Sequence, residues 1–205
     1  MSRRAFIATP TYRGDVVTEY VTSLMRDFID CAANGWYIEK PWFKSDTLIH
    51  FARHHAIDAF LQSKHEVLVF IDADMGWEEG GLRKLLETDG DIVGGLYPSK
   101  SDKPHWPFQG EVLDQPFYAV DGLPTGFMKV TRRAVHRILA DFPKPFAPMY
   151  AENGDEWGED LAFCNRAKQC GLSVVARTDI EFVHIGPFAW KGRFSDFVKA
   201  QNNGD

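Results

Sequence analysis

Two carboxylates one residue apart, Asp72 and Asp74, follow a continuous apolar run, Val67–Ile71. A run of this kind is typical of a strand that is covered on both faces, as in a parallel sheet. The end of such a strand would hold both carboxylates at the carboxyl edge of the sheet, where open α/β proteins bind their ligands. Carboxylate oxygens suit a hard divalent cation such as Mg²⁺ or Mn²⁺, which can in turn bind phosphate groups. An isolated pair with this spacing is more often an acidic turn cap.

A second acidic pair, Glu159 and Asp160, lies at the start of a predicted helix, in the sequence Trp157-Gly158-Glu159-Asp160. A carboxylate in the first helical turn is stabilised as the anion, so it is available to accept a proton. The same position suits a helix N-cap. His184 follows at the end of a predicted strand, where a lone histidine is more often a structural residue than a metal ligand.

The elements that must position these groups alternate between strands and helices. An apolar run that stops at Pro10 predicts the first strand, and Ser45 or Asp46 can cap the second helix. The alternation predicts an α/β fold with a mostly parallel central sheet flanked by helices. The expected strands are 5–9, 67–71, 91–93, 117–120, 127–130, 172–176 and 180–183, and the expected helices are 16–32, 46–63, 80–87, 132–140 and 158–169.

The pieces together resemble the GT-A glycosyltransferases, especially the family-2-like branch. The motifs that carry the resemblance are Ala5 to Thr11, Phe70-Ile71-Asp72-Ala73-Asp74, Trp157-Gly158-Glu159-Asp160 and Val183-His184. The resemblance extends over roughly residues 5–190 and implies one GT-A (Rossmann-like) domain over residues 1–200. The polar tail 201–205 is expected to fray.

The resemblance also implies roles for these residues. Asp74 would bind Mn²⁺ or Mg²⁺ directly, Asp72 would contact the ribose or a metal-bound water, and His184 would be a third ligand through its neutral imidazole. The donor would be a nucleotide-sugar, with a UDP-sugar expected. Asp160 would be the general base and Glu159 would orient the acceptor or a loop. Direct displacement by the acceptor hydroxyl predicts inversion at the anomeric carbon, although retaining enzymes share this fold.

Further positions match the family less sharply. Arg53 could contact the nucleotide or lie on a solvated helix face, and Trp106, Phe108 and Trp157 could stack on sugars or pack in the core. Lys100 could neutralise phosphate, and the glycines before it permit close backbone approach to a ligand. The nucleotide-sugar-binding candidates are Thr9, Pro10, Thr11, Tyr12, Arg13, Arg53, Asp72, Ala73, Gly95 and Lys100, and the acceptor-side candidates are Thr125, Gly126 and Trp157.

Composition limits the partners. The net charge of -6 gives no overall field that attracts nucleic acid or anionic membranes. The three cysteines, Cys31, Cys164 and Cys170, have no metal-type spacing and indicate buried thiols in a reducing cytoplasm. No apolar run approaches the roughly 18 residues of a membrane span, so no membrane partner is expected.

Two other functions and several acceptors stay open. The run from Leu68 to Gly76 also resembles the nucleophile motif of haloacid-dehalogenase-type phosphatases, and a non-catalytic relative could bind a nucleotide-sugar without turnover. The acceptor could be a glycan, a small molecule or a hydroxymethylated base of DNA, since some compact bacteriophage enzymes of this class glycosylate such bases. A nucleic-acid acceptor would require one basic face formed by Arg132, Arg133, Arg137, Lys191, Arg193 and Lys199. The acceptor, whatever its chemistry, is expected to lie against Pro143 to Trp157 and the segment after His184.

Overall fold

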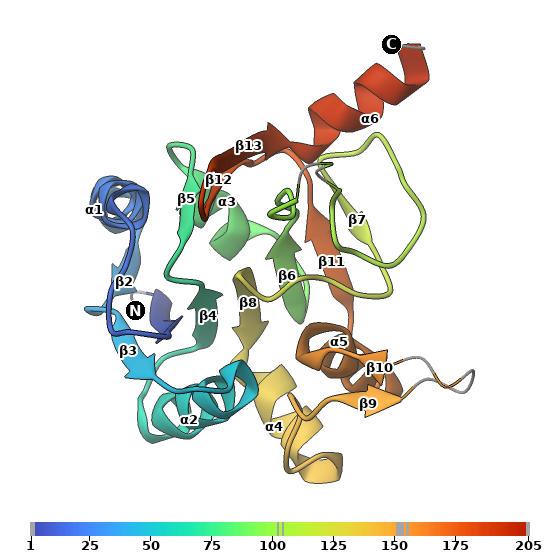
Figure 1. Cartoon of the computed structure of the whole chain (residues 1–205). Helices are drawn as coiled ribbons and strands as arrows, with labels where there is room; N and C mark the ends of the chain where they lie inside the picture. Colours follow the sequence, from blue (N-terminus) through green and yellow to red (C-terminus); the bar gives the residue numbers. More distant parts are fainter. Residues whose placement is uncertain (1–2, 102, 104, 151–153, 155, 204–205) are drawn as a thin grey trace.

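The computed structural model describes residues 3–101, 103, 105–150, 154 and 156–203 (Figure 1). Its centre is an eight-stranded sheet in the order β2-β1-β4-β8-β6-β11-β7, with β3 also paired to β1. The strands are β1 (Arg3–Thr11), β2 (Trp36–Ile38), β3 (Trp42–Ser45), β4 (Val67–Ile71), β6 (Ile92–Gly95), β7 (Phe117–Ala119), β8 (Phe127–Thr131) and β11 (Val174–Arg177).

The sheet is mixed. Strand β1 is parallel to β2, β3 and β4, and β6 is parallel to β11. Strand β8 lies between β4 and β6 and is antiparallel to both, and β7 is antiparallel to β11. The predicted α/β class with a mostly parallel core is therefore confirmed, with two antiparallel strands added.

Helices cover both faces of the sheet, as the continuous apolar run of β4 predicts (Figure 1). Leu68 and Phe70 belong to one core cluster with residues of α2, α4 and α5, whereas Val69 and Ile71 belong to a second cluster with residues of α1 and α3. Successive strand residues thus alternate between two cores. The helices are α1 (Thr18–Ala33), α2 (Ile49–Gln62), α3 (Gly81–Glu87), α4 (Arg132–Asp141), α5 (Glu159–Gln169) and α6 (Phe194–Asn203).

Two small antiparallel sheets complete the fold. Strands β5 (Met75–Trp77), β12 (Glu181–Ile185) and β13 (Ala189–Arg193) form one of them, in the order β13-β12-β5. In that sheet the register pairs His184 with Met75, and Ile185 N–H donates to the carbonyl of Asp74 at 2.9 Å. The other is the pair β9 (Met149–Tyr150) and β10 (Glu156–Trp157). The first sheet brings the late histidine beside the early aspartate.

The structure differs from the sequence prediction at several boundaries. Strand β1 continues through Pro10 to Thr11, where it pairs with β3. Pro10 lies beyond the stretch Ala5 to Ala8 that pairs with β4, so its missing N–H interrupts no bond on that side. The unpredicted strand β3 occupies Ser45, so α2 begins later, at Ile49. Helix α6 runs into the tail expected to fray, and residues 204–205 lie outside the described residues.

No helix within the described residues is both long enough and apolar enough to cross a membrane.

Candidate active site

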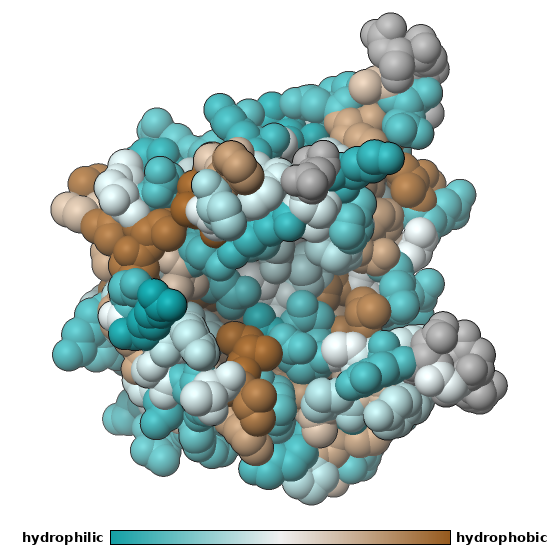
Figure 2. All heavy atoms as spheres, viewed as in Figure 1, coloured by the Kyte–Doolittle hydropathy of each residue, from teal (hydrophilic) through white to brown (hydrophobic). Residues whose placement is uncertain are grey.

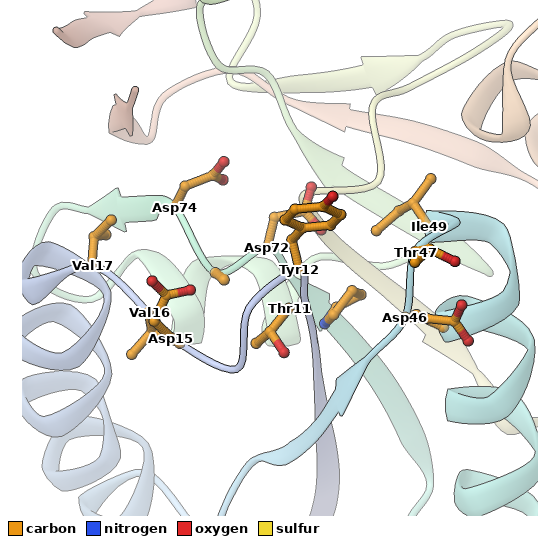
Figure 3. A pocket seen from close by; sticks show the side chains of 13 residues that line it. Thr11, Tyr12, Asp15, Val16, Val17, Asp46, Thr47, Ile49, Asp72 and Asp74 are labelled. Atoms are coloured by element: carbon orange, nitrogen blue, oxygen red, sulfur yellow. The ribbon is translucent and has the colours of Figure 1, made fainter. Parts of the chain in front are cut away.

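A cavity of about 370 Å³ opens where β1, β3 and β4 end at the same edge of the sheet (Figure 3). The sequence predicts this edge as the ligand site because Asp72 and Asp74 follow the buried strand β4. In the structure the parallel strands β1, β3 and β4 bring their carboxyl ends together there. The described residues that line it include four aspartates and neither lysine nor arginine. The lining residues are Pro10, Thr11, Tyr12, Asp15, Val16, Val17, Asp46, Thr47, Ile49, Ala52, Asp72, Ala73 and Asp74.

Asp74 lies at the cavity beside His184. The Nδ1–H of His184 can donate to the carbonyl of Pro98 at 2.9 Å, which leaves Nε2 facing Asp74 Oδ1 at 3.7 Å. Burial lowers the pKa of His184, so its ring is neutral at pH 7. Asp74 Oδ1 is buried and has no hydrogen-bond partner among the described residues, whereas Oδ2 pairs with the ammonium of Lys100.

These two atoms fit the divalent cation that the GT-A resemblance implies. A carboxylate oxygen without another partner and the Nε2 of a neutral imidazole whose Nδ1–H is bound to a backbone carbonyl are an ordinary pair of metal ligands. Within the described part of the chain, however, no group of three or more His, Cys, Asp or Glu side chains is placed to hold a metal ion. The predicted metal-site residues Asp72, Asp74 and His184 are therefore not grouped as three ligands among the described residues, and the carboxylate of Asp72, expected at the ribose or a metal-bound water, is paired with Arg53.

Arg53 connects the two predicted acidic motifs. Its side chain is 2% exposed, so the solvated helix face considered for it is wrong. Nη1 donates to Glu159 Oε1 at 2.7 Å and to Asp160 Oδ1, and Nη2 lies 3.3 Å from Asp72 Oδ1. One guanidinium thus links the end of β4 to the start of α5.

Asp160 also accepts a hydrogen bond from the hydroxyl of Thr125, at 2.5 Å. Both Thr125 and Arg53 donate to Oδ1, which orients the carboxylate and leaves Oδ2 as the oxygen not used by these two donors. Burial, followed by repulsion from Asp160, raises the pKa of Glu159. Burial also raises the pKa of Asp72 to about 6, although Arg53 opposes the shift.

Gly126 allows Asp72 to approach β8. Its N–H donates to the hydroxyl of Tyr97 at 2.9 Å, and its carbonyl accepts from Asp72 N–H at 2.9 Å. A Cβ at Gly126 would lie 2.8 Å from Asp72 Oδ2 and even closer to the Tyr97 hydroxyl. Two of the three predicted acceptor-side residues, Thr125 and Gly126, therefore lie against Asp160 and Asp72.

Some predicted site residues are not brought to the cavity. The Thr9 hydroxyl is fully buried and bonded to the hydroxyl of Tyr20 at 2.6 Å, and Arg13 is exposed and does not line the cavity. Gly95 packs against Phe182, whose ring fills the space that a Cβ would need, so its backbone does not approach a ligand there.

The predicted aromatic residues have other partners. Trp157 lies in β10, paired with Met149, and part of the hairpin that it closes falls outside the described residues. Trp106 and Phe108 pack on Phe194 of α6, as core residues do.

Seven lining residues were not predicted as site residues, namely Asp15, Val16, Val17, Asp46, Thr47, Ile49 and Ala52. Asp15 and Val16 follow β1, and Asp46 and Thr47 follow β3. Strand β3 carries no clear periodic signal, so the sequence offers no reason to place Asp46 in the same cavity as Asp72. In addition, Thr11 is 5% exposed and its Oγ1 has no hydrogen-bond partner among the described residues.

Apolar side chains form part of the rim. Ile49 lines the cavity, and Leu48 and Phe51 beside it are 50% and 45% exposed. Figure 2 shows apolar surface near the start of α2 and further apolar patches on the same face, including one near α1.

The basic residues do not form one face. Arg132 donates to the carbonyls of Phe60, Ser63 and His65 at the end of α2. Helix α4 lies at the end of the molecule opposite to β13 and α6 (Figure 1). The remaining pairs with acids are Arg133 with Asp91, Arg137 with Asp141, Lys191 with Glu181, and Arg193 with Glu78 and Asp196.

Comparison with solved structures agrees with the expected architecture. The crystal structure of A197 from STIV matches with a TM-score of 0.60 and 19% sequence identity, over 89% of this chain and 86% of that one. The fold is thus GT-A-like, as predicted. No family model matches the sequence, and no curated protein does.

Proposed function

We propose that this chain is a metal-dependent glycosyltransferase. It transfers a sugar from a nucleoside diphosphate sugar, with a UDP-sugar as the expected donor, to an acceptor hydroxyl with inversion. The observation that carries the proposal is that two carboxylate pairs from distant parts of a GT-A-like chain meet at one edge of the sheet. Asp72 and Asp74 face the cavity, while Glu159 and Asp160 lie across the guanidinium of Arg53.

The cavity supports the choice of donor. The Thr11 hydroxyl, which has no partner in the described part of the chain, and the carboxylate of Asp46 offer acceptors for the N–H groups of a nucleobase, and Tyr12 offers an aromatic face. The four lining aspartates would repel a diphosphate that lacked a counterion. Mn²⁺ or Mg²⁺ would be held by Asp74 Oδ1 and His184 Nε2, and would supply charge neutralisation to the departing diphosphate.

Asp160 is the proposed general base. Its Oδ1 is fixed by Arg53 and Thr125, so Oδ2 can take the proton of the acceptor hydroxyl. As the proton leaves, the hydroxyl oxygen of the acceptor forms a bond to the anomeric carbon. The bond between the anomeric carbon and the diphosphate oxygen breaks, and its electron pair leaves with the diphosphate. A positioned base of this kind contributes typically ~10²- to 10⁴-fold to the rate.

A neutral acceptor is favoured over DNA. A nucleic acid would need phosphate contacts from a connected basic surface. Five of the six candidate basic residues are instead bound to acids or to backbone carbonyls, and the six are split between opposite ends of the molecule. A glycan or small hydroxylated acceptor does not require such a surface.

The test is mass spectrometry of transfer from a panel of nucleotide-sugars, with Mn²⁺, onto simple glycosides, hydroxymethylated DNA and unmodified DNA. Transfer to a glycoside is the expected result. Metal-dependent UDP binding without transfer or donor hydrolysis would indicate a non-catalytic binding protein. A covalent aspartyl-phosphate at Asp72 would indicate a phosphatase.

A further inference from the structure

Arg53 is a buried charge that only its acidic neighbours can compensate. An arginine does not lose its proton in a protein, and an unpaired charge in the interior is strongly unfavourable. Both terminal nitrogens are engaged, Nη1 by Glu159 and Asp160, and Nη2 by Asp72. Arg53 does not line the cavity. These contacts leave little of the guanidinium to bind a nucleotide.

The guanidinium also rests on an aromatic ring that is tied to α5. The Cζ of Arg53 lies 5.8 Å from the ring centroid of Phe146, which stacks on Phe163 of α5 at 4.2 Å with an interplanar angle of 4°. The N–H of Phe146 donates to Nε2 of His54, the neighbour of Arg53 in α2, at 3.1 Å. Arg53 is therefore held from α2 and from α5 at the same time.

The positive charge of Arg53 keeps the carboxylates around it in place. Three carboxylates face one guanidinium, so its removal would leave like charges close together at a half-buried site. The carboxylates would then move apart or bind protons. Either change would disturb the orientation that Arg53 and Thr125 impose on Asp160.

We propose that Arg53 is a positioning residue that acts on transfer through Asp160, and that it does not bind the donor. The inference rests on the proposed function and deepens it. Arg53 holds the base, Asp160 of α5, at a fixed position relative to Asp72 at the end of β4, where the donor would bind. The ammonium of a lysine cannot reproduce the two-pronged guanidinium that contacts both Asp72 and Asp160. Arg53→Lys therefore keeps the positive charge but loses the link between these two carboxylates.

The experiment is a double-mutant cycle of Arg53→Lys and Asp160→Asn, with kcat, donor KM and metal-dependent UDP affinity measured for all four proteins. Arg53→Lys should lower kcat by about 10²-fold, as small misplacements of a reacting group do. UDP affinity should change less than about threefold, and the substitution should have little further effect in the Asp160→Asn background. Additive losses, or a loss of UDP affinity as large as the loss of kcat, would overturn the proposal.

Arg132→Lys is the matched control, since Arg132 also contacts the end of α2 but donates there to backbone carbonyls and the Ser63 hydroxyl, and to no carboxylate of the described residues. It should lower thermal stability and leave kcat unchanged. The free energy of unfolding of the same four proteins tests the role of Arg53 separately from the proposed glycosyltransferase function. If the wild-type chain transfers no sugar, the proposed function fails. Coupling between Arg53 and Asp160 in stability would still support the holding role, and additive stabilities would overturn it.

Discussion

Arg53 and Asp160 are 107 residues apart in the sequence and form an ion pair. The pair ties the second helix to the fifth at the edge where the cavity opens. Asp160 is therefore not an independent carboxylate, because the guanidinium that binds it also binds Asp72 of the first acidic pair, Asp72 and Asp74. The two motifs that define the proposed site share one counterion.

Asp74→Asn should remove metal-dependent nucleotide binding. Asp74 supplies a buried carboxylate oxygen that no described residue hydrogen-bonds, and an amide is a much weaker ligand for a hard cation. We expect UDP affinity with Mn²⁺ to fall at least tenfold, to the level seen with EDTA, as measured by calorimetry. Asp141→Asn, on the exposed face of α4, is the control and should bind as wild type. Equal UDP affinity of the wild-type chain with EDTA and with Mn²⁺ would contradict the metal assignment.

Asp160→Asn should separate chemistry from binding. The amide has the same shape and can still accept from Thr125, but it cannot take a proton. We expect transfer to fall by ~10²-fold or more while UDP affinity is nearly unchanged. Glu159→Gln should have a smaller effect, because Glu159 contacts Arg53 and has no assigned proton transfer. Near-normal transfer by Asp160→Asn would move the base to another residue.

The sequence predicts the parts of this site that depend on strong local patterns. The apolar run of β4 places Asp72 and Asp74 at the sheet edge, and the start of α5 places Glu159 and Asp160 in a first helical turn. The antiparallel position of β8 could not be predicted, because an isolated apolar strand carries no information about its direction. The same limit applies to Arg53, whose burial depends on three carboxylates from distant positions.

Lys100→Met should have opposite effects on the affinity for the metal ion and on the affinity for the nucleotide. In the structure the Lys100 ammonium pairs with Asp74, so a cation that binds this carboxylate must displace it. We expect Mn²⁺ affinity without nucleotide, measured by electron paramagnetic resonance, to rise several-fold. UDP affinity at saturating Mn²⁺ should fall, because a positive charge near the diphosphate is lost. A fall in both affinities would mean that Lys100 does not compete with the metal.

Gly126→Ala should damage the site through a clash. The added Cβ would lie 2.8 Å from Asp72 Oδ2 and closer still to the Tyr97 hydroxyl, so Asp72 or β8 must shift. We expect loss of stability in thermal unfolding and at least tenfold weaker metal-dependent UDP binding. Gly158→Ala is the comparison, because a Cβ added there would meet no described atom within 4 Å and only a small capping cost is expected. Similar UDP affinities for the two variants would exclude a role for this close approach.

His54 should make the fold sensitive to acid. Burial, with the nearby charge of Lys144, lowers the pKa of His54 to about 4, whereas an unfolded histidine titrates near ~6.5. The unfolded chain therefore binds this proton first, so stability is full above pH ~6.5 and is lost as the pH falls toward 4. The structural reason is that Nε2 accepts the N–H of Phe146, and protonation would set two donors against each other. Between pH 7 and 4 this residue is expected to lower the free energy of unfolding by an amount on the order of 2 kcal/mol.

His54→Gln keeps an acceptor that does not titrate, so the free energy of unfolding in urea should decline less between pH 7 and 4 than that of the wild type. His136→Gln, exposed on α4, should follow the wild-type curve. Parallel curves for wild type and His54→Gln would show that other groups cause the acid sensitivity.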